Sequence, residues 1–196
     1  MTKRVKMKLV IYMKIKVGIS LRHVHLTEED YNILFDEELT VKENLNQPGQ
    51  FSANQTVILE NNDRKIENVR VIGPNRAYTQ VEISRTDAYY LKLNPPVRTS
   101  GDLSDAEEIT ILGPKGKITR KACIIADRHI HITKEEREKL NLMKDTYQIK
   151  VEGEKGGILS NVKIKEAPNS YFELHIDADD GNAFNLKQND EVDINE

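Results

Sequence analysis

The chain has 196 residues and a mass of 22.5 kDa, enough for one domain or two small ones. Its formal net charge of 29 − 32 = −3 offers no basic excess that could hold a nucleic-acid backbone. The one cysteine excludes an internal disulfide framework and a zinc site built mainly from thiolates. No apolar run approaches the ~20 residues of a membrane-spanning helix, so neither a nucleic acid nor a membrane is an expected partner.

The N-terminal segment, residues 1–16, carries six Lys or Arg and no acidic residue. It lacks the apolar stretch and the small-residue cleavage site of a secretory signal. An amphipathic targeting helix is one interpretation, and a first strand with a basic tip is the other. We favour the strand, because Leu9–Tyr12 with Ile15 and Val17 is typical of the start of a strand, and nothing else in the sequence indicates a place outside the cytoplasm. The apolar residues of the chain include 20 Ile and 13 Val, which predict a core built from sheets.

An internal repeat runs through the rest of the chain. Its corresponding segments lie 106 or 93 residues apart: 22–29 (RHVHLTEE) with 128–135 (RHIHITKE), 68–71 with 161–164, and 81–83 with 174–176. A longer loop around 44–54 in the first copy accounts for the difference in spacing. The repeat predicts two copies of one β-rich unit, about 17–98 and 105–194, joined by a linker with two prolines.

Short strands separated by turn signals are typical of a barrel or a sandwich. Each HxH segment is followed by a helix start, because Thr133 with Glu136 matches a capping box and Thr27 begins a weaker version. We therefore expect short helices near 28–35 and 134–140, and a third from Thr86.

All five histidines of the chain fall within the repeat. His23 and His25 form one HxH pair, and His129 and His131 form the other. Alternate side chains of a strand share a face, so the two histidines of a pair point to the same side, with their Cα atoms about 6.6 Å apart. His175 occupies the place that Glu82 holds in the first copy.

A single HxH pair is usually two surface histidines, but two matching pairs favour a metal interpretation. Imidazole and carboxylate ligands without thiolate suit zinc or another divalent transition metal. Six ligands are enough for two ions with open coordination positions, which indicate catalysis. A pseudo-twofold arrangement would bring both sets into one cleft, and the positive charge there would attract an anionic substrate.

Arginine side chains are the expected partners of such an anion. The candidates are Arg22, Arg70, Arg76, Arg85 and Arg128. Arg76 is favoured, because it follows a Gly-Pro-Asn turn six residues before Glu82 and could bind a phosphate with two parallel hydrogen bonds. Cys123 lies in an apolar run and is expected to be a buried, inert thiol.

Together these features resemble the phosphate propanoyltransferases, the phosphotransacylases of propanediol-utilising bacterial microcompartments. The resemblance covers about 17–194 and rests on an ordered set of segments: VGISLRHVHLTEED, QPGQF, VIGPNRAYTQVEISRTDA, NPPVRTSGDL, IIADRHIHIT and ELHIDADDGNA. It implies a mainly β fold of two tandem pseudo-repeated β-barrel domains with short capping helices. The expected division is a basic segment 1–16, a first barrel 17–98 and a second barrel 99–196, with the N-terminal strand able to pack on the second.

The resemblance also implies a set of site residues. Two zinc ions per chain would be bound, the first by His23, His25, Glu82 and His175 and the second by His129 and His131. Arg76 would be the catalytic, phosphate-binding residue. The implied contacts of coenzyme A (CoA) are Ile19, Ser20, Leu21, Arg64, Arg70 and Asn182. The expected residue at position 21 is Asn, so Leu21 departs from the pattern.

The reaction implied is the interconversion of a short acyl-CoA (propanoyl-CoA, also acetyl-CoA) and phosphate with an acyl phosphate and CoA. A dinuclear-metal hydrolase of an anionic substrate, a cupin and a non-catalytic metal-binding or shell module are the alternatives. The resemblance leaves open a homodimer, contacts with a microcompartment shell or cargo, and residence inside a microcompartment.

Overall fold

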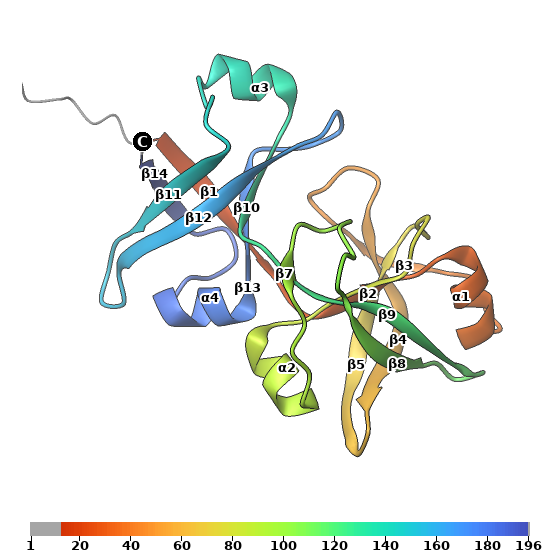
Figure 1. The fold of residues 1–196 in the computed structure, drawn as a ribbon. Helices are drawn as coiled ribbons and strands as arrows, with labels where there is room; N and C mark the ends of the chain where they lie inside the picture. Colours follow the sequence, from red (N-terminus) through yellow and green to blue (C-terminus); the bar gives the residue numbers. More distant parts are fainter. Residues whose placement is uncertain (1–12, 196) are drawn as a thin grey trace, which may run out of the picture.

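The computed structural model describes residues 13–195, which form fourteen strands and four short helices. The strands close into two barrels that lie next to each other (Figure 1). The prediction of a mainly β fold with two barrels and short helices is therefore confirmed. Most of the predicted basic segment, residues 1–12, lies outside the described residues, and residues 13–16 begin strand β1 (Met13–Ser20).

Six strands form the first barrel, and they neighbour one another in this order: β4 (Phe51–Asn61), β5 (Arg64–Gly73), β2 (His23–His25), β6 (Gln80–Glu82), β9 (Lys117–Ala126) and β8 (Glu107–Leu112). The ring closes because β8 pairs antiparallel with both β9 and β4. Two short strands extend it, β3 (Val41–Asn44) on β4 and β7 (Val97–Arg98) on β9.

Six strands also close the second barrel, in the order β1, β13 (Glu173–Asp177), β10 (His129–Ile132), β12 (Gly157–Glu166), β11 (Thr146–Val151) and β14 (Glu191–Asn195). The neighbours correspond to those of the first barrel. β2 is parallel to β5 and antiparallel to β6, and β10 is parallel to β12 and antiparallel to β13. The sequence repeat is therefore a repeat of strand topology.

The two barrels differ from the two halves of the chain that the repeat suggested. Strands β8 and β9 follow residue 98 but pair with β4 and β6 of the first barrel. Strand β1 precedes β2 but pairs with β13 and β14 of the second. The physical reason is that each barrel closes only with a sixth strand. In the first barrel β9 fills this place beside β6, and in the second β1 fills the equivalent place beside β13.

This exchange makes the chain cross between the barrels twice, once between β1 and β2 and once between β9 and β10. Each crossing carries an arginine that binds a helix of the barrel that the chain enters. Arg22 Nε lies 3.1 Å from Asp87, and Arg128 lies 2.6 Å from Asp180. These two arginines therefore anchor the crossings through carboxylates of the chain.

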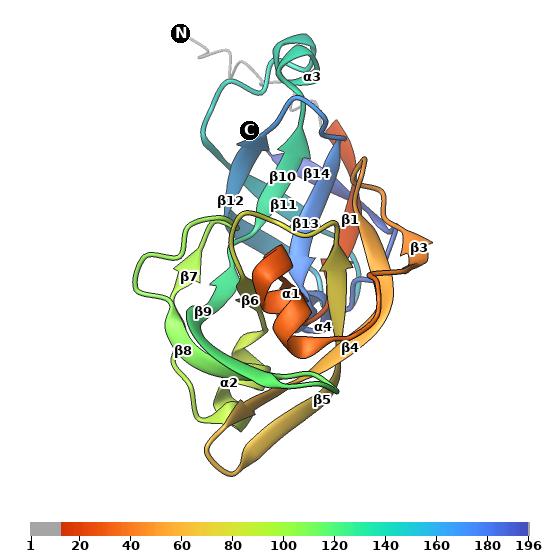
Figure 2. The ribbon, with the colours of Figure 1, turned by 90° about the vertical axis from the view of Figure 1, so that its right-hand side faces the viewer.

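The helices are α1 (Glu28–Leu34), α2 (Arg85–Leu91), α3 (Lys134–Lys139) and α4 (Ala178–Phe184). Threonines at positions 27 and 133 cap α1 and α3 as expected, and both side chains accept from the backbone three residues on. Figure 2 shows how α1 covers one end of the first barrel. Helix α4, which the sequence analysis did not predict, meets α2 across the junction, where the Thr86 amide donates to Asp179 (2.8 Å).

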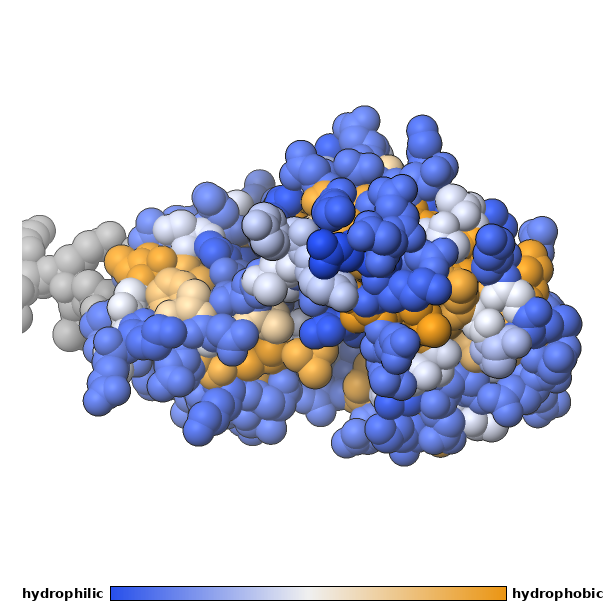
Figure 3. All heavy atoms as spheres, turned by 90° about the horizontal axis from the view of Figure 1, so that it is seen from below, coloured by the Kyte–Doolittle hydropathy of each residue, from blue (hydrophilic) through white to orange (hydrophobic). Residues whose placement is uncertain are grey.

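Each barrel encloses its own hydrophobic cluster. The first contains residues of β8 and β9 such as Ile109 and Cys123, and the second contains Ile15 and Val17 of β1. Cys123 is fully buried, which confirms the expected buried cysteine, and this burial raises the pKa of its thiol to about 12. The face drawn in Figure 3 is mostly hydrophilic, with apolar residues showing between polar ones. In the described part of the chain, every helix is too short or too polar to cross a membrane.

The large, fully buried side chains of the second hydrophobic cluster are expected to contribute most to the free energy of unfolding of that barrel. Ile149 of β11 is fully buried, so Ile149→Ala should lower the free energy of unfolding by about 2–5 kcal/mol through lost burial and the cavity left behind. The matched control is Ile158→Ala on β12, which is 52% exposed and should change it by less than about 0.5 kcal/mol. Urea unfolding measures both, and equal values for the two variants would contradict the assigned core.

Candidate metal centre

A cavity of about 560 Å³ lies between the two barrels. All six histidine and glutamate side chains proposed as metal ligands line it, together with Arg70 and Arg76. The barrel crossings explain this, because each HxH pair is the first segment that the chain forms after entering a barrel. The structure thus brings together, in one cavity, residues more than 100 positions apart in the sequence.

The first group of potential ligands consists of His23, His25 and Glu82. Glu82 of β6 is the register partner of His23 in β2, and its Oε2 lies 3.6 Å from Nε2 of that histidine. The three ligand atoms lie within 4.8 Å of one another. We call this group the first triad.

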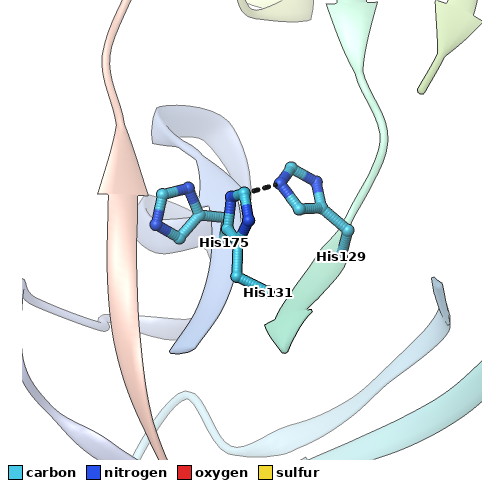
Figure 4. A group of neighbouring side chains, drawn as sticks. All are labelled: His129, His131 and His175. Atoms are coloured by element: carbon cyan, nitrogen blue, oxygen red, sulfur yellow. Dashed lines mark hydrogen bonds between the residues drawn. The ribbon is translucent and has the colours of Figure 1, made fainter. Parts of the chain in front are cut away.

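The second group consists of His129, His131 and His175, whose ligand atoms also lie within 4.8 Å of one another. Figure 4 shows the three rings close together, with a dashed line between His129 and His131. This line joins their Nε2 atoms, which lie 3.1 Å apart. We call this group the second triad. The structure places His175 here rather than with His23, His25 and Glu82, because β13 is the neighbour of β10 and His175 is the register partner of His129.

Backbone carbonyls orient three of the imidazole rings. Nδ1 of His23 contacts the oxygen of Leu21 (2.8 Å), Nδ1 of His25 that of Ile72 (3.2 Å), and Nδ1 of His129 that of Asp127 (2.8 Å). A carbonyl oxygen can only accept, so these contacts place the proton on Nδ1. The lone pair of a neutral ring is then on Nε2, as a metal ligand requires.

Gln80 orients the carboxylate of the first triad. This fully buried side chain donates from Nε2 to Oε1 of Glu82 (2.6 Å) and to Ser100 (2.9 Å), and its Oε1 accepts from the Gly101 amide (2.8 Å). With Oε1 engaged, Glu82 presents Oε2 to His23. Gln80 was not predicted as a site residue, although its position two residues before Glu82 places both on the same face of β6.

Glu173 and Tyr171 surround His175 in the second triad. Nε2 of His175 donates to Oε2 of Glu173 (2.8 Å), and the Tyr171 hydroxyl lies 2.6 Å from the same nitrogen. Glu173 also accepts from Asn46 (2.9 Å), which belongs to the first barrel's 45–50 loop. These three residues were missed, and the only sequence signal was the Glu-x-His spacing on β13.

Burial sets the charge states of the triads. It lowers the pKa of His129 to about 4 and that of His131 to about 2, and it lowers the pKa of His25 well below its usual value. Burial opposes ionisation of Glu82, but His23, His25 and Lys165 outweigh it and hold the pKa of that carboxyl at about 2. At neutral pH His25, His129 and His131 are therefore neutral and Glu82 is ionised, the protonation states that bind a cation.

The donor set fits a divalent metal ion. Two ligands about 2.0–2.1 Å from a tetrahedral metal are about 3.3 Å apart, close to the 3.1 Å between Nε2 of His129 and His131. Nε2 of His129 accepts in this contact when His131 carries its proton on Nε2, and a cation that replaces this proton would be bound by both rings. Each triad could therefore hold one metal ion.

The remaining predicted residues divide into those in the cavity and those outside it. Arg76 Nη2 donates to Gln50 (3.2 Å), and Arg70 Nη1 donates to the carbonyls of Ala53 and Asn54. Ile19, Ser20 and Leu21 also line the cavity, but Arg64 and Asn182 do not. Arg64 instead lies over the ring of Tyr90, 5.5 Å from its centroid.

Lys165 is a cavity residue that the sequence analysis did not identify. It lies on β12 as the register partner of His131. Burial and the nearby charge of Arg76 lower the pKa of Lys165, while Glu82 and Asp127 act in the opposite direction. The cavity thus holds a second cation close enough for the charge of Arg76 to act on it.

Residue 18 lies so close to the second triad that it has no room for a side chain, and glycine occupies this position. A Cβ there would lie 2.5 Å from Oε2 of Glu173 and 2.7 Å from Nε2 of His175. Gly18→Ala should therefore displace both groups and weaken divalent-metal binding at the second triad by about 10–100-fold, with the first triad unaffected. The control is Lys16→Ala, an exposed position of the same strand. Calorimetric titration of the metal-free variants measures this, and wild-type affinity at both sites would contradict the ligand set.

Acidification should destabilise the metal-free protein through the second triad. The pKa values of about 4 and about 2 for His129 and His131 lie below the ~6.5 of an unfolded histidine. From about pH 6.5 to about pH 4 the unfolded chain binds more protons, so the free energy of unfolding falls as the pH falls, by at most about 1.4 kcal/mol per pH unit and histidine. Urea unfolding at several pH values measures the slope. His129→Asn should make it shallower, and an unchanged slope would show that this histidine is not buried in its neutral form.

Comparison with known proteins gives a consistent result. The family model described as phosphate propanoyltransferase matches residues 16–187. A protein named phosphate propanoyltransferase from Rhodopseudomonas palustris (strain BisB18) is 42% identical over 185 residues, 92% of this chain and 82% of that protein. One of the same name from Thermotoga maritima is 46% identical over 181 residues (90% and 86%), and one from Priestia megaterium is 43% identical over 173 residues (86% and 80%).

Proposed function

Because the chain belongs to the phosphate propanoyltransferase family, we propose that it transfers a short acyl group between CoA and phosphate. The substrates are propanoyl-CoA and also acetyl-CoA, and the products are the acyl phosphate and CoA. The bond from the acyl carbon to sulfur breaks, a bond to a phosphate oxygen forms, and the phosphate proton ends on the CoA thiol. The observation that carries this proposal is the cavity that unites both triads with Arg76.

The metal ions of this proposal are two Zn²⁺ ions, one at each triad. Neutral imidazoles with one carboxylate suit zinc, and three protein ligands leave a coordination position open for a substrate. Zinc would supply Lewis acidity, which polarises the thioester carbonyl and stabilises negative charge on oxygen or sulfur. Gln80 and the backbone carbonyls described above hold the ligands in place.

Arg76 binds and orients the phosphate in this mechanism. Its guanidinium faces the cavity from the first barrel and carries one hydrogen bond from Nη2 to a neutral amide, that of Gln50. A phosphate is a stronger acceptor than this amide and fits the planar guanidinium with two parallel hydrogen bonds. Arg76 would thus fix the attacking oxygen with respect to the thioester carbonyl, which contributes to the rate through positioning.

Phosphate would attack the thioester directly, because neither Cys123 nor Ser100 is placed as a free nucleophile. Cys123 is buried in the first core with its pKa raised to about 12, so it cannot serve as a nucleophile. The hydroxyl of Ser100, which lines the cavity, accepts a hydrogen bond from Gln80 (2.9 Å).

We propose the same six residues as contacts of CoA that the family resemblance implies. Ile19, Ser20 and Leu21 line the cavity at the first barrel crossing, and Arg70 lines it from β5. Arg64 and Asn182 lie outside the cavity, so they would contact the distal part of CoA rather than its thioester. We place the enzyme in the cytoplasm or inside a microcompartment because of the family resemblance, and we propose its small-molecule substrates as its partners.

The test is release of free thiol from propanoyl-CoA and acetyl-CoA by the purified holoenzyme, with and without phosphate. We expect release only with phosphate. A dinuclear-metal hydrolase would release thiol without phosphate, and that result would overturn the proposal.

Arg76→Ala should raise the KM for phosphate by about 10–100-fold, because a charge-assisted pair of hydrogen bonds is lost. The metal content should stay unchanged. The control is Arg85→Ala, an exposed arginine bonded to Asn94, which should retain the wild-type KM. Loss of metal from Arg76→Ala would show that this arginine has a structural role instead.

A further inference from the structure

Lys165 is a cation of the cavity that has no close partner. Within residues 13–195, its ammonium forms neither a salt bridge nor a hydrogen bond. Its neighbour on the same face of β12, Lys163, contrasts with it, because the Lys163 ammonium lies 2.6 Å from Asp127 and 3.2 Å from Thr99. The chain thus pairs one of the two lysines and leaves the other facing the cavity.

The two carboxylates whose charges act on Lys165, Glu82 and Asp127, each have other partners, although Oδ1 of Asp127 has no hydrogen bond. Glu82 accepts from Gln80 and belongs to the first triad. Asp127 accepts from the Thr99 hydroxyl (2.7 Å) and pairs with Lys163. Lys165 is partly buried, and burial of an ammonium without a close partner is costly, so an anion that enters the cavity explains its position best.

Arg76 faces the same cavity from the other barrel. Its charge acts on Lys165, and its guanidinium donates from Nη2 to the neutral Gln50 amide. Two like charges at one cavity repel each other, and one anion with more than one negative charge can offset both. Phosphate has that charge and enough acceptor oxygens for both donors.

We propose that Lys165 is a second phosphate-binding residue, which together with Arg76 holds the phosphate between the two barrels. The inference rests on the function proposed above. Lysine suits this place because its compact ammonium has three donors on a flexible stem. It can follow the phosphoryl oxygens as free phosphate becomes acyl phosphate, while the planar guanidinium of Arg76 fixes the orientation.

The experiment compares Lys165→Met and Lys165→Arg with the wild-type holoenzyme. Calorimetric titration with inorganic phosphate measures the Kd, and steady-state kinetics measure KM for phosphate, acyl phosphate and CoA. Lys165→Met should raise the Kd and KM for phosphate and acyl phosphate by about 10-fold or more. Lys165→Arg should recover most of this loss. The KM for CoA and the metal content should stay unchanged. The control is Lys121→Met, an exposed lysine of β9, which should behave as wild type.

Three results would overturn the inference: wild-type phosphate affinity in Lys165→Met, an equal rise of the KM for CoA, or loss of metal from both variants. The last result would assign Lys165 to the support of the triads. Failure of the proposed function is distinguishable, because a wild-type enzyme without phosphate-dependent thiol release would refute the transfer reaction whatever the variants do.

Discussion

The chain passes between its two barrels immediately before each HxH pair, and the arrangement of the cavity depends on these two crossings. Barrel closure enforces them, because strand β1 completes the second barrel and β9 completes the first. A histidine pair that begins a strand right after a crossing must lie at the junction of the barrels. Two barrels related by the same topology therefore bring the two HxH segments, from distant parts of the chain, to one place.

The two triads are equivalent in position but differ in charge. Glu82 and His175 both pair in register with the first histidine of their HxH segment, so one position of the repeat has diverged from carboxylate to imidazole or the reverse. A divalent ion would keep a net charge of about +1 at the first triad and about +2 at the second. The second triad would therefore polarise a carbonyl or stabilise an anion more strongly, and the first would suit a group that has to leave again.

Much of this organisation could be predicted from local sequence patterns. The HxH spacing predicted shared faces, the capping threonines predicted helices α1 and α3, and the repeat predicted that Glu82 and His175 are equivalent. The HxH spacing and the capping threonines each extend over a few residues, and backbone geometry alone converts them into structure. The repeat works differently, because it transfers what one copy shows to the equivalent positions of the other.

The features that the sequence did not reveal depend on pairing between distant strands. His175 belongs to the second triad because β13 neighbours β10, and β8 and β9 belong to the first barrel because β8 pairs with β4. Gln80, Glu173 and Lys165 are ordinary strand residues by pattern, and only the closed barrels show that their polar groups meet the triads. The most direct measurement of the central claim is anomalous diffraction at the zinc edge from crystals of protein purified without chelators. The account predicts two peaks in the cavity, one at each triad, and a single peak or peaks elsewhere on the surface would contradict it.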